Sequence, residues 1–290
     1  MTLRVLVPGD EPALEAFLVR HADESMLLRS NMRAAGLVDR GAWLEGTYVA
    51  ALERDTIVGV AGHFWNGMIT LQAPAHAGAV ACAVAQRSGR VVAGVLGPWA
   101  QAQEALRALG LERAPTNAEP REGLYALDLD ELVVPAPLAT GRVTCRRVRD
   151  DELELISTWH AEFSIETQGR TDGPMLRREA ADLMAVFHRG GSTWLLEDAG
   201  RPVAFSAFSG ALPDMVQVAA VWTPPDLRGR GYARAAVAGS LLAARADGVR
   251  RAVLLAHMPA AIRAYAALGF RLVGDYGLVL LTERRHFRRD

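Results

Sequence analysis

Two glycines and three arginines stand together in the segment LRGRGYAR, residues 227–234. The first backbone N–H groups of a helix have no partner inside it, and the helix dipole adds partial positive charge at that end. Gly229 and Gly231 allow close approach of a ligand to the backbone, and Arg228 and Arg230 add charge. The segment predicts a pyrophosphate site on backbone N–H groups. The alternative is a solvated turn whose glycines cap a helix.

The flanking segments favour the pyrophosphate site. Residues 215–222, MVQVAAVW, are apolar on both faces, as in a buried strand. Residues 233–248, ARAAVAGSLLAARADG, are typical of a helix whose small side chains pack closely on a sheet. Other phosphate-binding loops fit less well, because the Gly-Lys-Ser/Thr of a Walker loop and the third glycine of a dinucleotide fingerprint are both absent.

This segment resembles motif A of the GNAT superfamily of acetyl-CoA-dependent N-acetyltransferases. That motif reads Arg/Gln-x-x-Gly-x-Gly/Ala, and Arg228, Gly231 and Ala233 fill it. Residues 258–276, MPAAIRAYAALGFRLVGDY, resemble a later motif of the family, except that Met258 replaces an asparagine. The resemblance covers about residues 141–285 and implies acetyl-CoA as the acyl donor substrate.

The resemblance also implies roles for single residues. A backbone donor to the thioester oxygen, and the strand that pairs with the pantetheine arm, would lie at Val221, Trp222 and Thr223. Arg228 would stand at the edge of the pyrophosphate. The backbone N–H groups that hold it would come from Gly229, Arg230, Gly231, Tyr232, Ala233 and Arg234. Tyr265 would protonate the leaving thiolate, and the alternative for Tyr265 is a half-buried core tyrosine.

The group that takes a proton from the amine is left open. Trp159, Phe163 and Glu166 share one face of a predicted helix, and burying an acid beside two aromatic rings is costly without a partner. Glu166 is therefore the first choice for contact with the substrate. Glu162 and His160 fall on more polar faces and are expected to be solvated. His257 closes a strand near the site, and its alternative is a capping or loop histidine.

The two halves of the chain repeat one order of elements. Each has a short strand, two helices, a hairpin, then strand, helix, strand, helix and a closing strand pair, which indicates an internal duplication. Prolines and small residues mark a linker. We predict an α/β (α+β) protein of two tandem GNAT-like domains, residues 1–134 and 142–290, with a linker at 135–141. Each domain is expected to hold a mixed, mostly antiparallel, splayed sheet flanked by helices.

The N-terminal half lacks the residues of the predicted pyrophosphate site at residues 227–234, which we call the cradle. Pro74, His76 and Gly78 stand at the matching place, with no arginine and no Gly-x-Gly. We interpret this half as a degenerate domain. Three roles are left open for this half: shielding the substrate site, stabilising the rest of the chain, and binding a small regulator.

Composition narrows the class of function. The formal net charge of −1 over 290 residues gives no basic field, so nucleic acid is not an expected partner. No apolar run suits a membrane span, and Cys82 and Cys145 have no metal-type spacing. We predict a cytoplasmic, metal-free N-acetyltransferase, monomer or homodimer, that acetylates a primary amine of a small molecule or amino-acid-like substrate. The alternative is a non-catalytic acyl-CoA sensor or scaffold.

Overall fold

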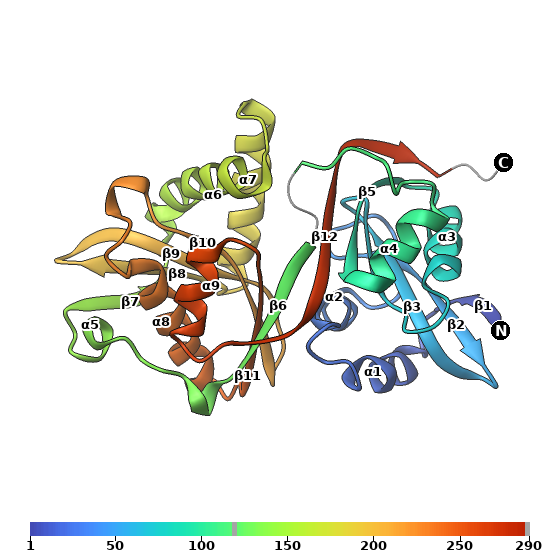
Figure 1. Ribbon diagram of the computed structural model, residues 1–290, viewed down its shortest axis with the longest axis horizontal. Helices are drawn as coiled ribbons and strands as arrows, with labels where there is room; N and C mark the ends of the chain where they lie inside the picture. Colours follow the sequence, from blue (N-terminus) through green and yellow to red (C-terminus); the bar gives the residue numbers. More distant parts are fainter. Residues whose placement is uncertain (118–120, 288–290) are drawn as a thin grey trace. The chain divides into compact units, whose positions relative to one another are not determined.

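Two compact units make up the chain in the computed structural model, which describes residues 1–117 and 121–287. Unit 1 comprises Met1–Gly123 and Gly274–Asp290, and unit 2 comprises Leu124–Val273. Figure 1 shows the elements of each unit in the colours of the sequence. The chain therefore passes from one unit to the other twice.

Unit 1 is a six-stranded sheet with two pairs of helices, counted over the described residues. Its strand order is β1-β2-β3-β4-β5-β12. In chain order its elements are β1 Thr2–Val5, α1 Glu11–Val19, α2 Met26–Ala35, β2 Gly46–Glu53, β3 Thr56–Phe64, β4 Met68–Gln72, α3 Ala77–Ser88, β5 Val91–Pro98, α4 Trp99–Ala108 and β12 Arg271–His286.

Unit 2 has the same plan, with strand order β6-β11-β10-β9-β8-β7 over the described residues. Its elements are β6 Arg121–Asp128, α5 Ala136–Ala139, β7 Val143–Arg147, α6 Leu153–Gln168, α7 Pro174–Arg189, β8 Thr193–Asp198, β9 Arg201–Ala211, β10 Met215–Trp222, α8 Tyr232–Ala246, β11 Arg251–Ala256 and α9 Pro259–Ala266. Short 3₁₀ turns occupy Leu129–Glu131, Asp150–Glu152 and Pro225–Leu227.

Both sheets are mixed and mostly antiparallel, as the sequence predicts. The parallel pairs are β4 with β5 in unit 1 and β10 with β11 in unit 2. A parallel pair needs a crossover connection, and α3 and α8 supply it. These are the two helices that follow the predicted cradle and its N-terminal counterpart.

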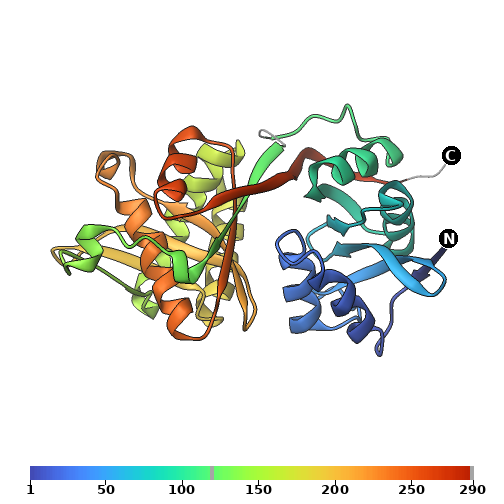
Figure 2. The same cartoon turned by 60° about the horizontal axis from the view of Figure 1, so that its bottom comes forward.

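Helices cover both faces of each sheet (Figure 2). In unit 2, α6 and α7 pack on one face, where Trp159 and Met184 meet Phe205. On the other face α8 contributes Val237 and Leu241 to an apolar cluster. β7 lies close to α8, because a Cβ on Gly239 would lie 2.2 Å from the Cβ of Cys145. The alanines and glycine of α8 therefore permit its close packing on the sheet.

The division of the chain differs from the predicted domains in its closing strands. β6 follows the helices of unit 1 but lies in the sheet of unit 2, beside β11. β12 follows unit 2 but pairs with β5, from Tyr276 opposite Pro98 to Leu280 opposite Gly94. Burial gives the physical reason, because Leu127 packs in the core of unit 2 and Val279 in the core of unit 1.

The predicted linker is also part of unit 2. Residues 136–139 form the short helix α5, and Leu138 packs against the apolar clusters beneath α8. Both cysteines have free thiols. No helix in the described parts of the chain is long and apolar enough to span a membrane. Within residues 1–117 and 121–287, no three His, Cys, Asp or Glu side chains are grouped to hold a metal ion.

Candidate functional site

The parallel pair β10–β11 opens towards its C-terminal end. Its paired residues run from Met215 opposite Arg251 to Val218 opposite Leu254, whereas β10 itself continues to Trp222. The opening coincides with a β-bulge, where the three steps from Ala219 to Trp222 match two steps on β9. Ala220 has a φ of 48°, in the left-handed region that a residue with a Cβ seldom adopts. A bulge bends its strand and ends local pairing.

The predicted cradle follows this opening directly. After a 3₁₀ turn, Gly229 and Gly231 have φ values of 77° and 79°, and Gly231 is the N-cap of α8. No side chain in the described residues caps α8 by a hydrogen bond. The N–H groups of its first turn are therefore directed outwards, as an anion site requires. The Arg234 guanidinium lies over this turn, with Nη2 3.5 Å from where a Cβ on Gly231 would stand.

Arg228 and Glu166, which the sequence assigned to different ligands, contact each other. Arg228 Nη1 and Nη2 donate to the two oxygens of Glu166, both at 2.9 Å. Arg228 Nε also donates to the Thr223 carbonyl at 3.0 Å, and the guanidinium lies 4.6 Å from the ring centre of Trp222. Both Glu166 oxygens are thus occupied by an arginine that belongs to the cradle.

Glu162 is a residue whose contact the sequence analysis missed. Its Oε2 accepts a hydrogen bond from Trp222 Nε1 at 3.2 Å, so α6 places a second carboxylate at the end of β10. The spacing of the two glutamates could have indicated this position, because Glu162 and Glu166 are four residues apart and therefore neighbours on one helix surface. Glu162 is half-buried rather than solvated.

The expectation that His160 is solvated is wrong. Its side chain is buried, and it stacks on Phe163 with ring centres 5.7 Å apart. Burial lowers the pKa of His160 to about 4, because the charged imidazolium loses its hydration. Its Nδ1 has no hydrogen-bond partner in the described structure. Trp159 packs in the core with Phe205, at 6.3 Å between ring centres.

Tyr265 lies on α9 at the edge of the apolar cluster of unit 2. It is 9% exposed and meets Phe270 edge-on, with ring centres 6.1 Å apart. Met258, which replaces the asparagine of the motif, is the N-cap of α9 and is partly exposed. Burial of the Tyr265 ring beside Phe270 fits a packing role.

Tyr232 anchors the start of α8 through its side chain. Its hydroxyl donates to the Asp198 carboxylate, which together with burial raises the pKa of Tyr232. The ring itself is buried beneath the loop. This contact ties α8 to the β8–β9 hairpin and fixes where the first turn begins.

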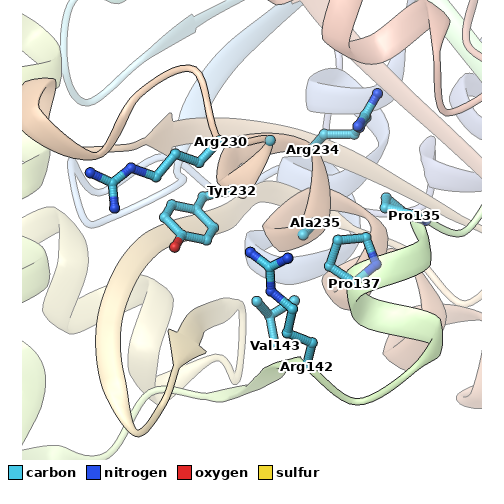
Figure 3. Close-up of a pocket in the computed structure, with 9 residues that line it drawn as sticks. Pro135, Pro137, Arg142, Val143, Arg230, Tyr232, Arg234 and Ala235 are labelled. Atoms are coloured by element: carbon cyan, nitrogen blue, oxygen red, sulfur yellow. The ribbon is translucent and has the colours of Figure 1, made fainter.

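A small cavity of about 20 Å³ lies beside the start of α8, with room for about one water molecule. Figure 3 shows the guanidinium of Arg142 between Tyr232 and Pro137, with Arg230 and Arg234 extending to opposite sides. The residues that line the cavity are Pro135, Pro137, Arg142, Val143, Arg230, Gly231, Tyr232, Arg234 and Ala235.

The matching helix start in unit 1 also has a left-handed N-cap, but a side chain of the chain caps it. His76 is the N-cap of α3 with a φ of 64°, and its ring contacts Glu53 at 2.8 Å. The N–H of Gly78 in the first turn of α3 donates to Oε1 of Glu104 at 2.9 Å. A carboxylate of the chain thus caps the helix start where unit 2 leaves N–H groups uncapped.

Comparison with known proteins finds one family match, within the second half of the chain. Residues 153–270 match the model of the acetyltransferase (GNAT) family. No curated protein matches the sequence. A solved Drosophila protein is similar in fold over 96% of this chain and 98% of its own, with a TM-score of 0.65 and 12% identity.

Two further solved structures are similar over nearly their whole length. A GCN5-related N-acetyltransferase from Sphaerobacter thermophilus has a TM-score of 0.58 and 17% identity, covering 99% of this chain and 96% of its own. A tandem GNAT protein from the clavulanic acid biosynthesis pathway has a TM-score of 0.57 and 13% identity, covering 100% and 99%. At these identities the similarity is one of fold.

Proposed function

Because residues 153–270 match the model of the acetyltransferase (GNAT) family, we propose that the chain moves an acetyl group from acetyl-CoA to a primary amine. The acceptor we propose is a small molecule or an amino-acid-like substrate. In this reaction the amine nitrogen forms a bond to the thioester carbonyl carbon and loses a proton, the C–S bond breaks, and the thiolate takes up a proton.

One observation carries the proposal: the opened end of β10–β11 leads directly into an uncapped helix start. Backbone groups of Val221, Trp222 and Thr223 would meet the pantetheine arm and the thioester oxygen. The pyrophosphate would lie on the N–H groups of residues 229–234. Because a left-handed glycine begins α8, this approach is not blocked by a Cβ.

The acceptor side would be formed by α6. Glu162 reaches the end of β10 through Trp222, so we propose it, rather than Glu166, as the carboxylate nearest the incoming amine. Glu166 would act as a positioning residue that holds Arg228 against Trp222. Tyr265 would donate the proton to the leaving thiolate.

The alternative is a non-catalytic protein that binds acyl-CoA as a sensor or scaffold. Two observations favour it. Met258 replaces the polar residue of the motif at the N-cap of α9, and both oxygens of Glu166 are engaged by Arg228. Under this alternative, acetyl-CoA binds but no thiol is released with any amine.

The test is release of free CoA thiol from acetyl-CoA with a panel of primary amines, alongside calorimetric titration of acetyl-CoA. We expect binding and amine-dependent release by the wild type, and neither by Gly231→Glu, whose carboxylate would occupy the cradle. Gly248→Glu is the matched control, because Gly248 also has positive φ but lies beyond the other end of α8. Binding without release supports the sensor, and absence of binding contradicts both functions.

A further inference from the structure

Three arginines around the cavity at the start of α8 have no carboxylate partner. Arg142, Arg230 and Arg234 line it together, and within the described residues none of them forms an ion pair. Arg230 donates to a backbone carbonyl, that of Asp226, at 3.4 Å, and the Nε of Arg234 is buried without a partner. By contrast, Arg228 in the same loop is neutralised by Glu166. Because Arg230 and Arg234 extend to opposite sides (Figure 3), the uncompensated guanidinium at the cavity itself is that of Arg142, and such a charge is expected to bind an anion.

We propose that Arg142 binds the 3′-phosphate of coenzyme A, and this inference rests on the proposed function. The diphosphate of acetyl-CoA would be held by the backbone of the first turn of α8 and by Arg234, which lies over Gly231. The molecule carries a second, separate phosphate as a monoester, with close to two negative charges at neutral pH. Arg142 faces the same cavity from its other side (Figure 3).

The elements on either side of Arg142, α5 and β7, determine its position. Arg142 directly precedes β7, and α5 before it packs on unit 2 through Leu138. Pro137 forms the wall of the cavity against the guanidinium. A guanidinium held in this way offers a planar pair of donors to phosphate oxygens. The stretch that the sequence marks as a linker would therefore determine specificity for the phosphorylated cofactor.

The experiment compares binding of acetyl-CoA and of acetyl-3′-dephospho-CoA by calorimetry. We expect the wild type to bind acetyl-CoA about 10-fold more tightly, the size of one charge-assisted hydrogen-bonded contact. In Arg142→Ala the affinity for acetyl-CoA should fall about 10-fold, and the affinity for the dephospho form should not change. Arg189→Ala, an exposed charge at the end of α7, is the control and should keep the wild-type preference.

Two results would overturn the inference. Equal affinity of the wild type for both cofactors would show that the 3′-phosphate is not bound. An equal loss of affinity for both cofactors in Arg142→Ala would assign the arginine to the diphosphate instead. In either case acetyl-CoA still binds, which separates failure of this inference from failure of the proposed function. Arg142 is exposed, so its replacement is not expected to disturb folding.

Discussion

Tyr265 is the predicted catalytic residue whose surroundings are compatible with two roles. If its hydroxyl protonates the thiolate, Tyr265→Phe should bind acetyl-CoA like the wild type and lower kcat by about 10- to 1000-fold. Tyr125→Phe is the control, because Tyr125 lies in the same apolar cluster on β6. The measurement is steady-state thiol release with saturating amine. Equal kcat values for Tyr265→Phe and the wild type would leave only the packing role.

The two glutamates of α6 give a matched pair of variants. Glu166→Gln should lower the Kd for acetyl-CoA about threefold, because Arg228 keeps its place on Trp222 but loses the neutralising charge of a half-exposed pair. It should not change the KM for the amine.

Glu162→Gln should do the opposite, raising the KM for the amine about 10-fold while cofactor binding stays as in the wild type. Calorimetry and steady-state kinetics on both variants decide between them. If instead Glu166→Gln raises the KM for the amine and Glu162→Gln does not, the assignment from the sequence holds.

Among the elements, the bulge on β10 is the one on which the open site depends. Deleting Ala220 removes the extra residue, so β10 could stay in register with β9 and continue its pairing with β11. We expect this variant to remain folded by circular dichroism and to lose acetyl-CoA binding. Ala220→Gly keeps the bulge and adopts the positive φ without a Cβ, so it should bind normally. Binding by the deletion variant would contradict this role of the bulge.

Local elements such as the cradle were predictable from the sequence, whereas the pairing of the closing strand β12 was not. The cradle was predictable because strand, Arg-Gly-Arg-Gly and helix are consecutive, and the φ values of Gly229 and Gly231 follow from local chemistry. The Arg228–Glu166 pair joins residues 62 positions apart, and periodicity carries no information on such a contact. The partner of β12 is equally non-local, because an apolar strand fits the edge of either sheet.

The polarity of its helix face also failed to predict the burial of His160. On the helix surface its neighbours include the polar Ser157 and Ser164, yet His160 is only 7% exposed. Its stacking on Phe163 and the position of α6 on its sheet decide its burial. Glu162 was misjudged for the same reason, since its hydrogen-bond partner Trp222 is on another element.

For the whole molecule we predict one acetyl-CoA site per chain. In unit 1 the helix start is capped by Glu104 and begins with His76, which carries a Cβ at positive φ. A carboxylate at this place repels a pyrophosphate. Calorimetric titration should therefore give a stoichiometry of one for the wild type and zero for Gly231→Glu. Two sites in the wild type, or one remaining in Gly231→Glu, would mean that unit 1 also binds the cofactor.

β12 belongs to unit 1 but is synthesised after unit 2. This has a consequence for folding during translation. Most of unit 1 is synthesised before any of unit 2, but β12, which brings Val279 and Leu281 to its core, follows after Val273. At about 5–20 residues per second, unit 1 waits roughly 10–30 s for its sixth strand. During that time the edge of β5 is unpaired, and an unpaired edge is a template for other chains. The nascent protein is thus most exposed to misassembly during translation of its second unit.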